Sequence, residues 1–296
     1  MEINEFAQKV LKAVEKELGA EYRAELKEVR KNNGVRLHGL LILQPGKNVV
    51  PTIYLDSFYA AYEDGVTFRE VLNRILEIFR EESPREDIDM DFFKSFEKVR
   101  DRICYRLVGR HNNAELLRDI PYVDFLDLAI CFYYAYSGGE LGDGTILIHN
   151  SHLEHWHIKT ADLMKLAKEN TPRIFPARIT PMLEMLGEEA DLLQNPLSEE
   201  DVPLMVLTNA GRLHGAACML YPGMLEGIGE KKQDGFYIIP SSIHEVLILD
   251  KTGMGTPEEM KGMIREVNAQ HVAAEEILSD NLYYFDVQSG TIKIIL

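Results

Sequence analysis

The sequence has few cysteines and none of the cysteine spacings that mark a redox or zinc centre. Its three cysteines, Cys104, Cys131 and Cys218, lie far apart among apolar neighbours. Thiols placed in this way are typical of reduced core residues in a cytosolic protein. No apolar run approaches the roughly 18 residues needed to span a bilayer, and the N-terminus lacks the apolar core of a signal peptide. We therefore expect a cytoplasmic protein without a membrane segment.

Recognised catalytic and nucleotide-binding motifs are also absent from the sequence. It contains no His-Glu-x-x-His zinc motif, no Gly-x4-Gly-Lys-Ser/Thr phosphate loop and no Gly-x-Gly-x-x-Gly fingerprint. No complete catalytic constellation is visible, although catalytic groups can converge from distant positions. We favour a binding or regulatory protein that contacts a protein partner over an enzyme, and the sequence identifies no cofactor.

Negative charge is abundant but unevenly distributed along the chain. The net charge is −16 over 296 residues, and residues 181–203 carry seven acids and no base. Such a block fits an acidic linker better than a charged working surface. A net negative chain is a poor binder of nucleic acid or of anionic membranes, so we expect neither as a partner.

The pattern of apolar residues predicts an α+β protein, with mostly antiparallel sheets and flanking helices in two halves. Helical spacing predicts a helix over residues 3–18, and Asn33-Gly34 predicts a hairpin turn between two strands. Thr67 and Glu70 have capping-box spacing before a second helix, and Thr256 and Glu259 have the same spacing before a helix in the second half. The other elements predicted in this half are strands at 22–30, 35–43, 51–55, 99–110, 125–136 and 145–149 and a helix at 160–170.

The second half has the element order β-α-β-β-α-β, which is the split βαβ order of ferredoxin-like folds. Its predicted elements are strands at 204–208, 236–240, 244–249, 282–287 and 291–296 and helices at 214–231 and 257–268. We therefore predict two α+β domains, residues 1–180 and 204–296, joined by the acidic linker 181–203.

One close grouping of a thiol with imidazoles lies in the apolar stretch 203–250. His214 precedes Cys218 by four residues, which places both on one side of a helix, and His244 opens a following strand. A thiolate–imidazole arrangement of these residues would supply the nucleophile of a hydrolase. The alternative is a small buried thiol that packs the helix on the sheet, and buried structural cysteines are normally inert. We expect the second outcome.

A cluster of histidines is a second candidate site. His149, His152, His155 and His157 fall within nine residues. Imidazole is the commonest metal ligand, and three or four converging donors form a metal site. The alternative is a polar turn anchored by Trp156, since the spacing matches no known zinc motif.

Arginines form a third candidate site on the predicted strand 99–110. Arg100, Arg102, Arg106 and Arg110 would share one face of that strand. Together they would grip an anion, an acidic partner or a nucleic acid. The alternative is a solvated face balanced by acids of neighbouring strands, and docking of the protein's own acidic segment fits the overall charge better than nucleic acid does.

Several sequence blocks resemble a known family. They include PTIYLDSFYAAYEDG at 51–65, FEKVRDRICYRLV at 96–108, TILIHNSHLEHW at 145–156 and FYIIPSSIHEVLIL at 236–249. Together they resemble the uncharacterised domain-of-unknown-function family 5688 of Clostridia. The second half is similar, more distantly, to the domain-of-unknown-function family 1444 through its Pro-x-x-x-His-x-Val-Leu-Ile strand. The resemblance implies a bacterial cytosolic protein, and it implies no activity, ligand or catalytic residue.

Overall fold

The chain forms two compact units in the computed structural model, residues 1–92 with 137–144 and residues 93–136 with 145–296. The structure describes residues 1–84, 91–138, 143–182, 184, 204–230, 232, 235–251 and 255–295. Both units combine helices with antiparallel strands, which confirms the α+β class. No helix in this described part of the chain is long and apolar enough to cross a membrane.

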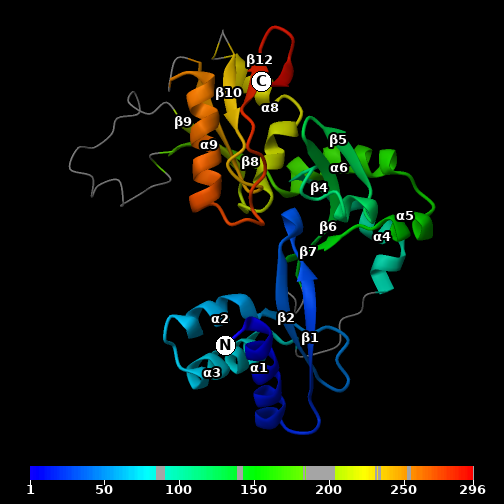
Figure 1. The fold of residues 1–296 in the computed structure, drawn as a ribbon. Coiled ribbons are helices and arrows are strands. Elements are labelled where there is room, and N and C mark those ends of the chain that lie inside the picture. Colours follow the sequence, from blue (N-terminus) through cyan, green and yellow to red (C-terminus); the bar gives the residue numbers. More distant parts are fainter. Residues whose placement is uncertain are drawn as a thin grey trace. The chain divides into compact units, whose positions relative to one another are not determined.

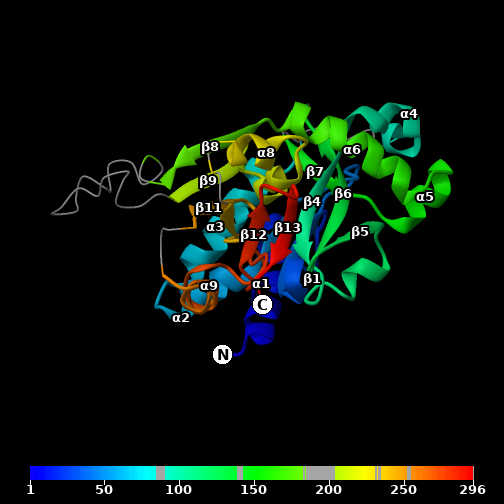
Figure 2. The ribbon, with the colours of Figure 1, turned by 90° about the horizontal axis from the view of Figure 1, so that it is seen from above.

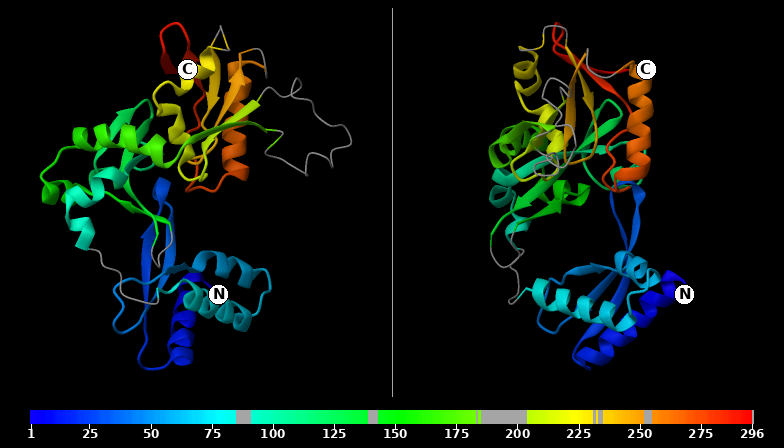
Figure 3. Two further views of the ribbon diagram at one scale, coloured as in Figure 1. Left: turned by 180° about the vertical axis from the view of Figure 1, so that it is seen from behind. Right: turned by 90° about the vertical axis from the view of Figure 1, so that its left-hand side faces the viewer.

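The first unit packs three helices against a three-stranded sheet. The strands are β1 (Arg23–Arg30), β2 (Arg36–Leu43) and β3 (Thr52–Tyr54), paired in the order β1-β2-β3. The helices are α1 (Ile3–Leu18), α2 (Leu55–Glu63) and α3 (Phe68–Glu82). Alternate strand residues face the core, where Leu40, Ile42 and Ile53 pack against the apolar stripes of the helices. Figure 3 shows these helices, coloured from blue to cyan, beside the blue hairpin.

Local sequence signals account for most of this unit. Asn33 adopts a left-handed φ of 59° in the turn between β1 and β2, which confirms the predicted hairpin. Thr67 caps α3 through the predicted capping box, in which its hydroxyl accepts from the Glu70 N–H at 3.3 Å. The helix at 3–18 is confirmed as α1. Helix α2 was not predicted, because Leu55 is its only fully buried residue and its sequence shows no full apolar stripe.

The second unit contains two sheets, and the smaller one is built around a buried strand. In it β6 (Leu128–Tyr136) pairs with β4 (Ile103–Gly109), β5 (Tyr122–Phe125) and β7 (Gly144–Leu147). The associated helices are α4 (Phe96–Val99), α5 (Asn150–Trp156) and α6 (Thr160–Ile174). Helix α6 covers β4 (Figure 1), and the hydroxyl of Thr171 accepts a hydrogen bond from the backbone N–H of Tyr105 at 3.1 Å.

The larger sheet has six antiparallel strands in the order β13-β12-β10-β11-β9-β8. Its elements are β8 (Ala177–Pro181), β9 (Leu204–Asn209), β10 (Phe236–Ile239), β11 (Val246–Asp250), β12 (Tyr283–Asp286) and β13 (Thr291–Ile294), with helices α8 (Met224–Gly229) and α9 (Pro257–His271). Strands β8 and β9 lie side by side at one edge (Figure 2). The element order predicted for residues 204–287 is confirmed. In a ferredoxin-like sheet β9 would lie between β11 and β12, whereas here β12 pairs with β10.

The contacts group the chain differently from the two predicted halves. Strand β8, from the first predicted half, pairs with β9 at the start of the second. Asp127, in the turn before β6, accepts three hydrogen bonds from side chains of residues 279–283. These contacts place residues 93–136 and residues 204–295 in one unit. The predicted acidic linker 181–203 lies outside the described residues, apart from residues 181, 182 and 184.

Candidate functional site

The four arginines of the predicted strand 99–110 do not share a face. Arg100 and Arg102 lie in a 3₁₀ turn, so β4 begins only at Ile103. Arg110 lies past the end of β4 and forms an ion pair with Asp124 at 2.9 Å. The predicted arginine surface is therefore wrong, because a 3₁₀ turn lacks the two-residue repeat that would align these side chains.

Arg106 is carried by β4 into the interior. The strand register places it opposite Cys131 of β6, on the face that also carries Cys104 and Tyr133. Its side chain is only partly exposed, and its Nε atom is buried without a hydrogen-bond partner. It forms no ion pair with any residue that the structure describes. Burial lowers the pKa of this guanidinium, because desolvation disfavours the charged form.

The loop after β9 adopts a conformation that rules out a long helix at this point. His214 has a left-handed φ of 54°, which a right-handed helix cannot contain. A 3₁₀ helix at Gly215–Leu220 follows, and residues 221–223 separate it from α8. The helix predicted over 214–231 is therefore wrong, and two short helical segments replace it.

Gly215 allows this loop to approach β9 and the chain before β11. A Cβ atom at Gly215 would lie 2.2 Å from Thr208 Oγ1 and 2.3 Å from the carbonyl oxygen of His244. The Thr208 hydroxyl itself donates to that carbonyl oxygen at 2.7 Å. Asn209 closes the loop by donating to the Leu213 carbonyl oxygen at 2.7 Å. A side chain at position 215 is therefore excluded by packing.

The loop brings His214 and His244 together. Their rings are stacked with centroids 5.9 Å apart, and the backbone N–H of His214 donates to His244 Nδ1 at 3.3 Å. The ring proton of neutral His244 therefore lies on Nε2, which is 3.7 Å from Glu276 Oε1. His214 is 7% exposed. Its burial, with the nearby charge of Arg106, lowers its pKa to about 3, so it is neutral at physiological pH.

Cys218 lies near these histidines but is not paired with either. It is fully buried, and its Sγ donates to the carbonyl oxygen of Thr208 at 3.2 Å. Burial raises the pKa of the thiol to about 11. Roughly one such thiol in ten thousand is a thiolate at pH 7, and the thiolate is the reactive form. These contacts are those of a structural cysteine.

The four histidines near α5 make separate contacts within the fold. The backbone N–H of His149 donates to His152 Nδ1 at 3.0 Å, and His155 Nε2 lies 3.1 Å from a backbone carbonyl oxygen. His157 ends the helix with a left-handed φ of 55°. Trp156 Nε1 donates to a backbone carbonyl oxygen at 3.1 Å. Across the described ranges, no three His, Cys, Asp or Glu side chains are grouped to hold a metal ion.

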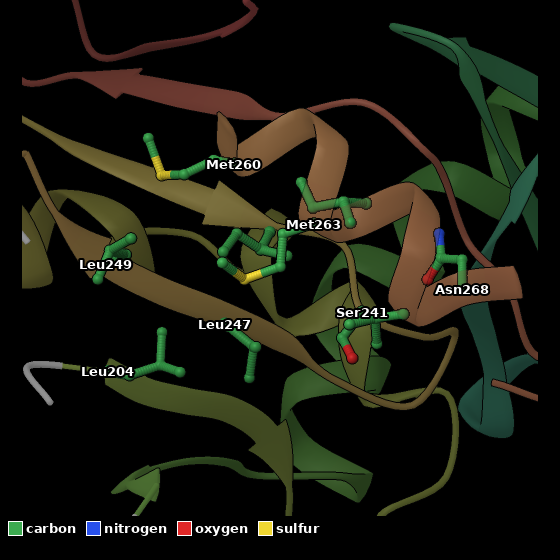
Figure 4. Close-up of a pocket in the computed structure, with 10 residues that line it drawn as sticks. Leu204, Ser241, Leu247, Leu249, Met260, Met263 and Asn268 are labelled. Carbon is green, nitrogen blue, oxygen red and sulfur yellow. The ribbon is translucent and has the colours of Figure 1, made fainter. Parts of the chain in front are cut away.

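An apolar cleft between α9 and the larger sheet was not predicted. It is lined by Leu204, Ile239, Ser241, Leu247, Leu249, Met260, Met263, Ile264, Val267 and Asn268. Figure 4 shows the methionines of α9 near leucines of β9 and β11. The cavity volume is about 100 Å³. The signal in the sequence was the spacing of Met260, Met263, Ile264 and Val267, which marks one wide apolar stripe on a helix.

Part of this apolar stripe is exposed beside the cleft. Met260 and Ile264 are buried at 3% and 5% exposure and pack with Leu249 in the core beneath α9. Met263 and Val267, in contrast, are 46% and 38% exposed. The stripe is therefore wider than the sheet covers, and its outer edge faces solvent at the mouth of the cleft.

Both ends of α9 are fixed, so the exposed side chains stand on an ordered element. Thr256 and Glu259 form the predicted capping box, and Pro257 occupies the first turn, where no N–H donor is needed. At the other end, Asn268 Nδ2 donates to the carbonyl oxygen of Ser279 at 3.1 Å. The backbone of α9 is thus fixed beside the mouth of the cleft.

Comparison with known proteins places the chain in a family. Residues 3–287 match the model of the Family of unknown function (DUF5688). The chain belongs to this family. The likeness of the second half to family 1444 is not shown, and no curated protein and no solved structure matches the chain. The family carries no assigned function, so the evidence on function comes from the contacts described above.

Proposed function

We propose that this member of family DUF5688 is a non-catalytic binding module that holds a segment of a partner protein in the cleft beside α9. The observation that carries the proposal is the exposure of Met263 and Val267 next to an apolar cavity. Contiguous exposed apolar surface with a polar surround marks interaction sites on globular proteins. The segment would insert one apolar side chain, such as leucine, into the cavity.

The size of the cleft favours a protein segment over a small-molecule ligand. Its cavity of about 100 Å³ is below the roughly 300–1,000 Å³ of small-molecule pockets. It is also smaller than the roughly 150 Å³ apolar cavity that holds benzene. A cavity of this size fits the end of one side chain, while the rest of the segment lies on the exposed edge of α9.

The residues of the mouth suit a surface that adapts to its partner. Met260 and Met263 are unbranched and polarizable, so they can repack around different apolar side chains. Only Ser241 and Asn268 of the lining are polar. Because Asn268 is already bonded to Ser279, the apolar contact carries the affinity and few polar groups restrict the choice of anchor.

Charge favours a partner with basic residues beside the anchor. The chain has a net charge of −16, and the seven acids of residues 181–203 immediately precede Leu204, which lines the cleft. Arg265 and Glu266 are both exposed on α9 between Met263 and Val267, so the negative charge comes from the rest of the chain and not from this turn of the helix. Such charges increase the association rate of a cationic partner and are screened within about 8–10 Å at physiological salt.

The hydrolase alternative, with His214, His244 and Cys218, is disfavoured by the burial and hydrogen bond of the thiol. We predict that a thiol reagent at neutral pH leaves Cys218 of the folded protein unlabelled and labels it after denaturation. The Cys218→Ser variant lacks this thiol and therefore shows which labelling signal belongs to Cys218. Labelling of native Cys218 faster than that of a free thiol would support the hydrolase alternative over the binding module.

The proposal is tested with synthetic peptides that carry one central leucine flanked by lysines. We expect measurable binding to the full chain, with an affinity that falls as salt rises. Replacing the leucine by alanine should weaken binding about tenfold or more, since burying a leucine side chain contributes roughly 1.5–3 kcal/mol. A peptide with glutamates in place of lysines should bind more weakly still.

Two glutamate variants of α9 give a matched comparison. Met263→Glu places a charge at the mouth of the cleft and should abolish peptide binding, whereas Ala269→Glu adds the same charge at an exposed position outside the lining and should not. Equal binding by both variants would contradict the proposal. A concentration-dependent dimer of the wild type that Met263→Glu dissociates would show instead that a second copy of the chain fills the cleft.

A further inference from the structure

Three polar side-chain atoms in the described part of the second unit are buried without a partner, and one of them is the hydroxyl oxygen of Tyr105. The other two, Arg106 Nε on β4 and His214 Nδ1 in the loop after β9, lie in the same region. Buried polar groups are almost always hydrogen-bonded, so each exception calls for an explanation such as a bound ligand. Neither residue is a cysteine or part of the cleft beside α9, so this region is independent of the proposed partner site.

The two groups share Tyr133 as a neighbour. The charge of Arg106 also lowers the pKa of the His214 imidazole. The ring of Tyr133 lies edge-on to the His214 ring, with centroids 5.4 Å apart, and Tyr133 is on the same strand face as Arg106. Tyr133 also packs against Phe175. A guanidinium, an imidazole and a phenol ring thus border one largely buried region.

No described acid supplies a negative charge beside Arg106. Elsewhere in the described chain arginines lie beside acids, as in the pairs of Arg36 with Glu28 and Arg74 with Glu77. The chain has 48 acids and 32 basic residues, yet none of the described acids pairs with Arg106. An unpaired, desolvated cation is costly, and an anion bound beside it would remove that cost.

We infer that Arg106, together with His214 and Tyr133, binds the carboxylate of a small organic acid. The planar guanidinium presents paired donors that match the two oxygens of a carboxylate. A neutral imidazole can carry its proton on Nδ1 and donate it to the same group. The partial exposure of the Arg106 side chain provides a route from solvent.

Charge and surroundings distinguish a carboxylate from a phosphate ester. The region supplies one positive charge, since His214 is neutral, and a carboxylate carries one negative charge. A phosphate monoester near pH 7 carries close to two, and Arg106 is the one arginine or lysine among the described residues whose charge acts on His214. The aromatic rings of Tyr133 and Phe175 favour an acid with a small apolar or aromatic body.

The test is the thermal unfolding midpoint of the full chain in acetate, benzoate, chloride and phosphate at equal ionic strength. We expect acetate and benzoate to raise the Tm by at least about 2 °C over chloride at saturating concentration. Arg106→Met should abolish this rise, and Arg106→Lys should weaken the affinity about tenfold, because a lysine loses the paired donors. Arg110→Met removes an exposed arginine next to the same strand and should leave the rise unchanged.

Two further readouts keep the inference testable if a variant folds poorly. In the wild type, acetate should shift the ¹⁵N–¹H signal of Arg106 Nε, assigned by its loss in Arg106→Lys. In chloride buffer, Arg106→Met should have a Tm equal to or above that of the wild type, because it removes an unpaired buried charge. The inference is overturned if carboxylates act no differently from chloride, if phosphate raises the Tm more than they do, or if Arg106→Met retains the carboxylate effect.

Discussion

The interiors of the two units differ in kind. In the first unit, no polar residue that the structure describes is buried, and residues such as Phe6, Leu40 and Ile75 form an apolar core. The second unit contains all of the buried polar residues described, namely Asn113, Asn170, Thr171, Thr208, Asn209, His214, Ser242, Asn268 and Ser279. Burying such groups costs free energy unless they are bonded, so their presence calls for partners.

Most of these polar groups in the second unit have partners within the fold. Asn170 donates to the carbonyl oxygens of Arg100 and Ile103, and Asn268 donates to that of Ser279. The side chain of His214 differs, because its Nδ1 atom has no partner. The comparison teaches that bonded buried groups hold the second unit together, and that the unbonded atoms Arg106 Nε and His214 Nδ1 are where we propose a ligand.

The largest change in the free energy of unfolding should come from protonating His214 in acid. Its folded pKa of about 3 lies below the unfolded value of 6.5, so the unfolded chain binds more protons as the pH falls between these values. The stabilisation is present above pH 6.5 and is lost as the pH falls through about 3. The loss is on the order of 5 kcal/mol. Denaturant unfolding measured across this pH range should show this loss of stability in the wild type. The His214→Asn variant should not show it.

A matched control for this prediction is His157→Asn. His157 has a similar left-handed φ of 55° and is exposed, and asparagine tolerates that conformation. We expect it to unfold in acid as the wild type does. If His214→Asn and the wild type lose stability in parallel from pH 6.5 to 3, His214 is not buried in its neutral form.

The next effect concerns Asp127, which bonds two parts of the second unit. Its carboxylate accepts from Ser279 at 2.5 Å, from Asn281 at 3.0 Å and from Tyr283 at 2.6 Å. Asp127→Ala should reduce the free energy of unfolding by about 3 kcal/mol, because it leaves buried donors without an acceptor. Asp124→Ala removes an exposed ion pair and should cost less than about 1 kcal/mol. Equal losses in denaturant titrations would contradict the assigned role of Asp127.

The smallest loss of stability should come from removing a helix cap, and it should be the same in both units. Thr67→Ala in the first unit and Thr256→Ala in the second each remove an exposed capping box. Each should cost about 1 kcal/mol, since an exposed cap does not depend on the interior behind it. Local hydrogen exchange at α3 and α9 measures the two losses separately. A loss several times larger at one helix would show that the units differ in more than their interiors.

Local signals in the sequence were enough for much of the fold. The Asn33-Gly34 turn and the capping residues Thr67 and Thr256 predicted where elements begin and end, and all three are confirmed. Each of these signals depends on residues a few positions apart. The same reasoning failed at His214, where a left-handed residue interrupts an apolar run that reads as a helix.

The candidate sites depended on contacts that the sequence does not encode locally. Arg106 and His214 belonged to two different predicted groups, and the packing of the loop after β9 near the smaller sheet brings them together. The apolar stripe of α9 was visible, but which of its residues the sheet leaves exposed follows from the width of the sheet. Arg106 and His214 are 108 positions apart in the sequence, and Asp127 lies 156 positions before Tyr283, which donates to it. Spacing along the chain could pair neither set of residues.

The most direct test of the proposed function is the ¹³C-methyl spectrum of the methionines during titration with the lysine-flanked leucine peptide. The chain has eleven methionines, and Met260 and Met263 line the cleft, whereas Met219 is buried in the 3₁₀ helix after His214. We predict that the signals of Met260 and Met263, assigned by Met→Leu variants, shift with peptide concentration while that of Met219 does not. Shifts confined to other methionines, or none at all while the peptide binds, would contradict a partner site beside α9.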